Sequence, residues 1–248
     1  MKKEPIGAFT IAYGDPMNLM YAGMMANSFR HFHPEIPLII YTDEDVNAIT
    51  EERKTYRMYA VFGKRMAKKY ETVIQIDSDS IVTGSLDHIL DDKDFDLGGV
   101  LNNNTIDNQL TIHDISPQVY LNAGFIVSRD ERFWEWWDVL NHRMYFNNYQ
   151  YGEQDTYNII FHYGDIKSKI FDYDHRPYLH GLIHKGKWDK FVMRGNDIVL
   201  PKEDSGDGED KIISIIHWAG GCVPKMNFHT FFKPEVVKRL QELTNDKK

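Results

Sequence analysis

The sequence predicts a single α/β domain built on a largely parallel sheet. Up to Asp77, short apolar runs alternate with longer segments of helical spacing, as expected for strand–helix–strand units. The chain has 248 residues, which is enough for one large domain with a sizeable core. Neither an internal repeat nor a linker divides the sequence. Residues 1–248 are therefore expected to form one domain.

The first part of the chain predicts three strands and two helices. Ile6–Tyr13 is a continuous apolar run that Gly14 stops, which is typical of a buried strand. Asp15 and Pro16 then indicate a helix start, with an N-cap residue followed by proline at the first helical position. The next predicted elements are a helix over Met17–Phe32, a strand over Pro37–Asp43, a helix over Glu51–Tyr70 and a strand over Thr72–Asp77.

After Asp79 the pattern is less regular. The predicted strands are Asp94–Leu101, Tyr120–Ser128 and Lys211–Trp218, and the predicted helices are Arg129–Phe146, Gly152–His162 and Pro234–Leu243. Three intervening segments predict no regular structure, and they are Asn102–Gln118, Asp174–Lys190 and the acidic turn Asp204–Asp210. The first of these is longer than most connections, and long connections are usually functional or mobile.

Composition excludes several classes of protein. The net charge of -8 disfavours a nucleic-acid partner, because nucleic-acid binders usually carry a basic face. The single cysteine, Cys222, rules out an internal disulfide and agrees with a reducing compartment. No apolar run is long enough for a transmembrane segment, and the first residues do not resemble a signal peptide. We therefore expect a cytoplasmic protein. Dinucleotide-binding and P-loop motifs are absent near the first strand.

The most informative feature is a pair of carboxylates at the end of the strand over Thr72–Asp77. Asp77 and Asp79 flank Ser78, and a second apolar pair follows. Ligands of open α/β sheets bind beyond the carboxyl ends of strands, where unpaired carboxylates are costly. Mg²⁺ or Mn²⁺ satisfies such a pair and in turn holds a diphosphate. Because alternate residues of an extended chain point the same way, both carboxylates are expected to face one site. A solvated surface turn is the alternative.

Four segments resemble, in order, those of GT-A-fold glycosyltransferases, in particular glycosyltransferase family 8 and its relatives. The segments are the Asp-x-Asp region Val73–Ile89, the Asn-Ala-Gly strand in Tyr120–Phe125, Glu153–Asp155 at a helix start, and the His-x-x-Gly of His217–Gly220. The resemblance implies a GT-A fold, with a Rossmann-like central mixed sheet flanked by helices. It also implies transfer of a sugar from a nucleotide-sugar donor.

The resemblance implies roles for individual residues. Asp77, Asp79 and His217 would hold Mn²⁺ (or Mg²⁺). The donor, expected to be a UDP-sugar, would contact Tyr13, Asp77, Ser78, Asn122, Gly220 and Lys225. Gln154 matches the residue that lies near the anomeric carbon in enzymes that retain the anomeric configuration. In an inverting enzyme, Glu153 or Asp155 would instead activate the acceptor hydroxyl as a base.

The sequence departs from the family pattern after its late histidine. Val223 stands where family members usually have a lysine, and Lys225 follows two positions later. A cation near the leaving diphosphate is expected, and Lys64 and Arg65 are further candidates. The acceptor would be a glycan, a lipid-linked sugar or a protein. We expect the segments Asn102–Gln118 and Phe171–Trp188 to shape its site.

Three other functions remain open at this stage. A sugar-nucleotide pyrophosphorylase would need a glycine-rich loop with a basic residue after the first strand, which Tyr13–Pro16 lacks. A non-catalytic nucleotide-sugar or carbohydrate-binding module would not need the full set of two aspartates and a histidine. A two-metal hydrolase would need a denser cluster of histidines and aspartates.

Overall fold

The computed structural model describes most of the chain, namely residues 2–49, 54–102, 115–116, 118–143, 152–171, 178–180, 188–205, 208–217 and 231–245. Within these residues, no helix is both long enough and apolar enough to cross a bilayer.

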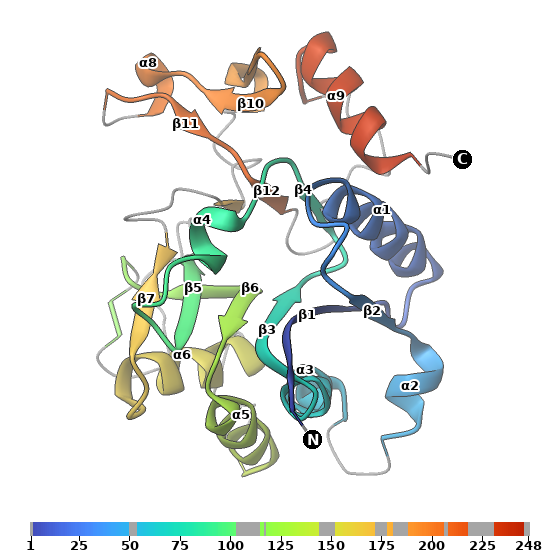
Figure 1. Cartoon of the computed structure of the whole chain (residues 1–248), viewed down its shortest axis with the longest axis vertical. Coiled ribbons are helices and arrows are strands. Elements are labelled where there is room, and N and C mark those ends of the chain that lie inside the picture. The colour runs from blue at the N-terminus through green and yellow to red at the C-terminus, as the bar shows by residue number, and fades with distance from the viewer. Residues whose placement is uncertain are drawn as a thin grey trace.

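A six-stranded mixed sheet forms the centre of the molecule (Figure 1). Its strand order is β2-β1-β3-β6-β5-β7, with β1 parallel to both β2 and β3. Strand β6 runs antiparallel to β3 and β5, and β7 is parallel to β5. The strands are β1 (Glu4–Ile11), β2 (Leu38–Tyr41), β3 (Tyr70–Ile76), β5 (Leu97–Leu101), β6 (Leu121–Ser128) and β7 (Ser168–Ile170).

Helices cover both faces of this sheet, because the central strands carry apolar side chains on each face. One face packs against α3 (Lys54–Ala67), α5 (Glu131–Arg143) and α6 (Glu153–Tyr163) in a cluster rich in aromatic side chains. The other face packs against α1 (Pro16–Phe32) and α4 (Asp87–Leu90). The short helix α2 (Asp43–Asn47) follows β2.

Two smaller three-stranded sheets form a second layer beyond α1, with α9 packed against it (Figure 1). One has the order β4-β12-β8 and the other β11-β10-β9. Their strands are β4 (Ser80–Val82), β8 (Tyr178–His180), β9 (Val192–Arg194), β10 (Asp197–Leu200), β11 (Lys211–Ile212) and β12 (Ile215–His217). The remaining helical elements are η3 (Trp188–Lys190), α8 (Lys202–Ser205) and α9 (Pro234–Thr244).

The predicted fold class is confirmed, and so are the main strands and helices within a few residues. Asp15 caps α1 as expected, since its side chain accepts a hydrogen bond from the backbone N–H of Met17 at 2.8 Å. Five short elements, α2, α4, β7, β9 and β10, are not predicted by the sequence pattern. These elements have three to five residues each, which is too short for hydrophobic periodicity to be read.

Three predictions about the second half are wrong. Lys211–Trp218 is not one strand, because β11 and β12 belong to different sheets. The segment Asp174–Lys190 is not wholly irregular, since Tyr178–His180 pairs in parallel with β12 and Trp188–Lys190 forms a 3₁₀ turn. Asp204 and Ser205, expected in an acidic turn, end the short helix α8. Pairing with distant strands decided the first two outcomes.

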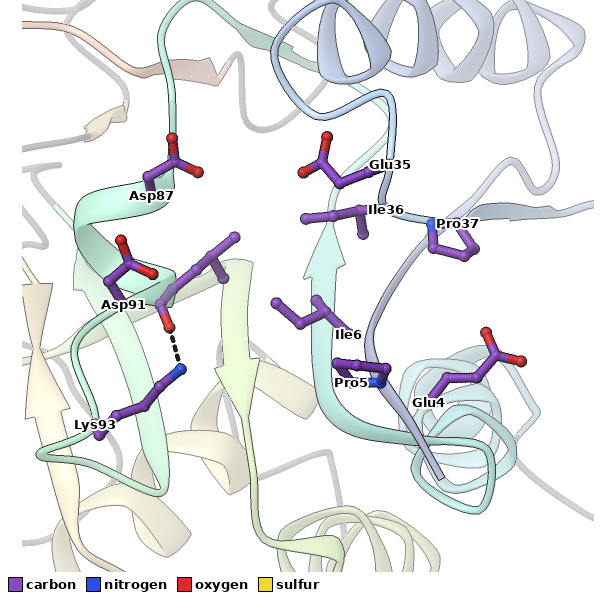
Figure 2. Close-up of a pocket in the computed structure, with 10 residues that line it drawn as sticks. Glu4, Pro5, Ile6, Glu35, Ile36, Pro37, Asp87, Asp91 and Lys93 are labelled. Atoms are coloured by element: carbon purple, nitrogen blue, oxygen red, sulfur yellow. Dashed lines mark hydrogen bonds between the residues drawn. The ribbon is translucent and has the colours of Figure 1, made fainter. Parts of the chain in front are cut away.

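A pocket of about 420 Å³ opens at the edge of the main sheet where β1 begins and just before β2. Figure 2 shows Glu35 on one side of this pocket and Asp87 and Asp91 on the other, with apolar side chains between them. Lys93 Nζ donates a hydrogen bond to the carbonyl of Leu90 at 2.7 Å. Because parallel strands begin at this edge, the pocket lies away from the predicted Asp-x-Asp site, which follows the end of β3.

Candidate metal and donor site

Asp77 and Asp79 follow β3, at the edge of the sheet where β1 and β3 end. The backbone N–H of Asp77 donates to the carbonyl of Gly124 at 2.9 Å, which ties the end of β3 to β6. Residues 78 and 79 form a turn, and Ser80 N–H closes it on the carbonyl of Asp77 at 3.1 Å. The two carboxylates therefore face one site because the chain turns between them. The extended geometry expected from the sequence is wrong.

His217 reaches these carboxylates from the far end of the sequence. It is the last residue of β12 and pairs in register with Ser80, the first residue of β4. Its Nε2 lies 3.0 Å from Asp79 Oδ1 and 3.5 Å from Asp77 Oδ2. The imidazole is 2% exposed, whereas both carboxylates are partly open to solvent.

The donor set suits a divalent cation. One potential ligand atom from each of Asp77, Asp79 and His217 lies within 4.8 Å of the other two. Two carboxylates and an imidazole match the ligand preferences of Mn²⁺, whereas an all-oxygen set would suit Mg²⁺ better. Burial alone would lower the pKa of His217, but the nearby carboxylates of Asp79 and Asp77 raise it to about 10. A cation bound here would take the place of that proton between the same groups.

Gly124 makes room for the histidine. A Cβ atom at this position would lie 2.4 Å from His217 Cε1 and 2.7 Å from Asn122 Oδ1. Only glycine allows β6 to pass so close to the imidazole. The glycine of the Asn-Ala-Gly sequence therefore has a structural role, because it packs directly on the imidazole of His217. His217, Asp77 and Asp79 are called the metal group below.

Asn122 and Gln154 form a second part of the site. Asn122 Oδ1 accepts a hydrogen bond from Gly124 N–H at 2.7 Å, and Asn122 Nδ2 donates to Gln154 Oε1 at 3.2 Å. Gln154 Oε1 also accepts from Ala123 N–H at 3.0 Å. These contacts join the start of α6 to β6 next to Gly124. The structure therefore brings Asn122 and Gln154 alongside the metal group.

The start of α6 is fixed by a buried network. Gly152 precedes it with a φ of 58°, a left-handed conformation that favours glycine. Trp137 Nε1 on α5 donates to the carbonyl of Glu153 at 2.9 Å. Asn158 bonds both the N–H and the carbonyl of Leu121 on β6, at 2.7 and 2.9 Å. These hydrogen bonds fix the start of α6, where Gln154 lies, against α5 and β6.

The two acids beside Gln154 have different environments. The pKa of Glu153 is raised to about 7, chiefly by burial and also by the charge of Asp77. Asp155 is completely buried and accepts a hydrogen bond from the hydroxyl of Tyr120 at 2.6 Å. The protonation of Glu153 therefore depends on the charge at Asp77. Asp155 instead binds Tyr120, the residue just before β6.

Tyr59 is a site residue that the sequence did not indicate. It lies in α3 close to the Asp77 carboxylate, and it stacks on Trp137 with ring centroids 6.2 Å apart. Its pKa is raised well above 10, first by burial and then by the charges of Asp77, Glu153 and Asp79. The phenol therefore keeps its proton beside these carboxylates. The residues around Tyr59 in the sequence do not indicate that its side chain lies near Asp77, because the two residues are brought together only by folding.

The other predicted donor contacts fall into three groups. Tyr13 lies two residues after β1, at the same edge as Asp77, and its carbonyl accepts a hydrogen bond from Asn18 Nδ2 at 2.7 Å. Ser78 lies in the turn between the two aspartates. Gly220 and Lys225 lie outside the described residues, as do most of the two segments expected to shape the acceptor site.

Lys64 and Arg65 are not at this site, which corrects that expectation. Both lie near the end of α3, just before β3 begins, whereas Asp77 follows the end of β3. Lys64 Nζ lies 2.9 Å from Asp138 Oδ2, and the Arg65 guanidinium lies 5.0 Å from the centroid of the Phe62 ring. The helix runs away from the Asp-x-Asp edge, so residues close to it in sequence lie far from it in space.

Comparisons with known proteins show which solved structures share this fold. No protein-family model matches the sequence, and no curated protein matches it either. Solved structures do match across nearly the whole chain. The bifunctional glycosyltransferase WbbM, in its apo structure, aligns with a TM-score of 0.63 at 14% identity. That alignment covers 98% of this chain and 50% of the WbbM chain, so the present chain spans about half of WbbM.

The galactosyltransferase LgtC, in complex with donor and acceptor sugar analogs, aligns with a TM-score of 0.56 at 14% identity over 97% of both chains. The fold is that of a GT-A glycosyltransferase. A structure of an LgtC active-site mutant, in which glutamate replaces a glutamine, aligns with a TM-score of 0.52 at 15% identity. It covers 94% of this chain and 99% of that one. The predicted resemblance to family 8-like glycosyltransferases is thereby confirmed at the level of the fold.

Proposed function

We propose that this protein is a metal-dependent glycosyltransferase that moves a hexosyl group from a UDP-sugar to a hydroxyl group of a glycan, a lipid-linked sugar or a protein. One observation carries the proposal. Asp77, Asp79 and His217 meet at the carboxyl edge of a GT-A sheet, with ligand atoms within 4.8 Å of one another. Ligands of open α/β sheets bind at this edge.

The chemistry follows from the charges involved. In the transfer, the bond between the anomeric carbon and a diphosphate oxygen breaks, a bond to the acceptor oxygen forms, and the proton of the acceptor hydroxyl is released. A cation held by the two aspartates and the histidine would stabilise the negative charge on the departing nucleoside diphosphate. The residues themselves supply the orientation. Gly124 allows β6 to pass close to His217, and Asn122 and Gln154 line the adjacent surface.

We further propose that transfer retains the anomeric configuration. Gln154, the residue that matches the family position near the anomeric carbon, is an amide and does not serve as a base. Its Oε1 is held by Asn122 and Ala123 beside the metal group. An LgtC mutant in which glutamate replaces a glutamine is described as an active-site mutant, which supports a role for a glutamine in such sites. The anomeric proton coupling of the product, measured by NMR, tests the proposal, since an inverted product would contradict it.

Nucleotide binding is the first measurement. Thermal unfolding is followed with UDP or GDP, each with and without Mn²⁺. Because a ligand of the native state raises apparent stability, we expect UDP to raise the melting temperature only when Mn²⁺ is present. If GDP rather than UDP stabilises the protein, the donor would be a GDP-sugar rather than a UDP-sugar. The absence of a shift with either nucleotide would contradict the proposed site.

Replacing Asp79 tests the metal group directly. Loss of a ligand that supports several kcal/mol of charge stabilisation should lower turnover of a UDP-sugar by roughly 100-fold or more. We expect Asp79→Ala to remain folded, because its carboxylate is partly exposed. Asp91→Ala, an exposed acid beside the distant pocket, is the matched control and should retain full activity. Full activity of Asp79→Ala would refute the proposal. Nucleotide binding by the parent chain without turnover of a UDP-sugar would favour a binding module.

A further inference from the structure

Gln75 is an unexpected residue at its position in β3. It is completely buried, and its register partners are Phe9 on β1 and Ile126 on β6. Both partners belong to the apolar cluster between the sheet and α3, α5 and α6. A buried amide costs free energy in such surroundings unless its polar atoms find partners. Packing alone therefore does not account for a glutamine here.

One half of the amide has a partner. Gln75 Nε2 donates a hydrogen bond to Asp77 Oδ1 at 2.8 Å. The other half does not, because Gln75 Oε1 is buried and accepts no hydrogen bond from any residue that the structure describes. An apolar side chain of similar size would fill the same space without leaving an acceptor unsatisfied. For stability alone, leucine or methionine would serve as well or better.

The hydrogen bond fixes one oxygen of a predicted metal ligand. Gln75 binds Oδ1 of Asp77, and Oδ2 of the same carboxylate faces His217 Nε2 at 3.5 Å. The protonated phenol of Tyr59 also lies close to this carboxylate. With one oxygen held by Gln75 and the phenol nearby, the carboxylate group has little freedom to rotate away from His217 and Asp79. Such partners of metal ligands orient them and raise metal affinity.

We propose that Gln75 is a positioning residue of the metal group, whose amide N–H holds the Asp77 carboxylate so that its free oxygen faces the cation shared with Asp79 and His217. The inference rests on the proposed function, because it presumes that this group binds a divalent cation. It assigns Gln75, a buried residue of β3, a role that it exerts only through its hydrogen bond to Asp77.

The test is the affinity of the full chain for Mn²⁺, measured without nucleotide by calorimetry and by the electron paramagnetic resonance signal of the free ion. Loss of a partner of a metal ligand typically weakens binding by about 10- to 100-fold. We expect Gln75→Leu to show this loss while its melting temperature without metal stays equal to that of the parent or rises. Gln75→Met, which is unbranched like glutamine, carries the test if the leucine variant fails to fold.

Thr72→Val is the matched control. Thr72 is also a buried polar residue of β3, but it lies at the other end of the strand. Its replacement should leave Mn²⁺ affinity unchanged. Parent-like affinity in a folded Gln75 variant would overturn the inference while leaving the proposed function intact. Failure of the parent chain itself to bind Mn²⁺ would instead overturn the metal-dependent function, and the inference with it.

Discussion

At the scale of single residues, the candidate site depends on neighbouring residues that orient the side chains of Asp77 and His217. Asp77 accepts a hydrogen bond from Gln75 and lies close to Tyr59, and His217 packs against the bare Cα of Gly124. The polar ligands are only one part of this arrangement. The close contact with Gly124 and the hydrogen bond from Gln75 determine whether those ligands converge.

Replacing Gly124 by alanine should disrupt the metal group. The added Cβ would lie 2.4 Å from His217 Cε1, so either the imidazole or β6 must shift. We expect Mn²⁺ affinity to fall by about 10-fold or more, as for other disturbed metal-ligand shells, when measured by calorimetry. The control is Gly23→Ala in α1, where an added Cβ meets nothing within 4 Å. That change should stabilise the helix by about 0.5–1 kcal/mol and leave Mn²⁺ binding unaltered. Equal affinities in both variants would show that Gly124 is not a spacer for His217.

At the scale of secondary structure, the site is carried by elements that are tied together by buried polar groups. Asn158 joins α6 to β6, and Trp137 joins α5 to the start of α6. On the same face, the buried carboxylate of Asp138 in α5 binds Arg57 at 2.7 Å and Lys64 at 2.9 Å, both from α3. Tyr59, which reaches Asp77, lies between those two basic residues in sequence. The α3–α5 contact thus supports the position of Tyr59.

Asp138→Asn should destabilise the chain by roughly 3 kcal/mol, because it removes the carboxylate charge that pairs with the buried Arg57 guanidinium at 2.7 Å. Urea unfolding measures the change. Glu131 lies on the same helix as Asp138 and forms an exposed pair with Lys3, which precedes β1, so Glu131→Gln should cost less than about 1 kcal/mol. A loss for Asp138→Asn no larger than for Glu131→Gln would contradict the assigned role of the pair.

The effect of Asp138 should depend on pH. Burial by itself raises the pKa of this carboxyl, but hydrogen bonds from Arg57 and Lys64 outweigh it and lower the pKa overall. The folded state therefore favours the ionised form. The stabilisation is fully present above the unfolded pKa of about 3.9 and is lost as the pH falls through the lower folded value. The difference between parent and Asp138→Asn should shrink below about pH 4, and a constant difference there would contradict this account.

At the scale of the whole molecule, the metal group joins two layers. Asp77 follows β3 of the main sheet, whereas His217 ends β12 of a smaller sheet that lies beyond it. Strand β4, which begins at Ser80, pairs with β12 and leads the chain from one layer to the other. A cation bound to all three side chains would therefore oppose separation of these layers.

Mn²⁺ should slow hydrogen exchange in the strands that meet at the group. At a concentration 100 times its dissociation constant, a ligand of the closed state stabilises it by about 2.7 kcal/mol, which is about 100-fold in an opening equilibrium. We expect this protection for the amides of Ser80–Val82 and Ile215–His217, measured by mass spectrometry. Strand β10 (Asp197–Leu200) belongs to another sheet and is the internal control. Uniform protection across both regions would indicate that Mn²⁺ does not act through this junction.

Much of the fold could be predicted from the sequence because the signals are local. The apolar run ending near Ile11, the Asp15–Pro16 helix start and the strand leading into Asp77 each depend on residues that are neighbours in the chain. The Asp-x-Asp pair was recognisable for the same reason. The short elements were not predictable, because three to five residues carry too little periodicity.

The sequence by itself determined that this protein has an α/β sheet with two carboxylates at a strand end. Only the tertiary structure decided which side chains surround them. The turn at Ser78, the passage of Gly124 against His217 and the contact of Tyr59 with Asp77 are features of the folded chain. The reason is physical, since local propensity depends on adjacent residues, whereas a site depends on the register of strands paired across much of the chain.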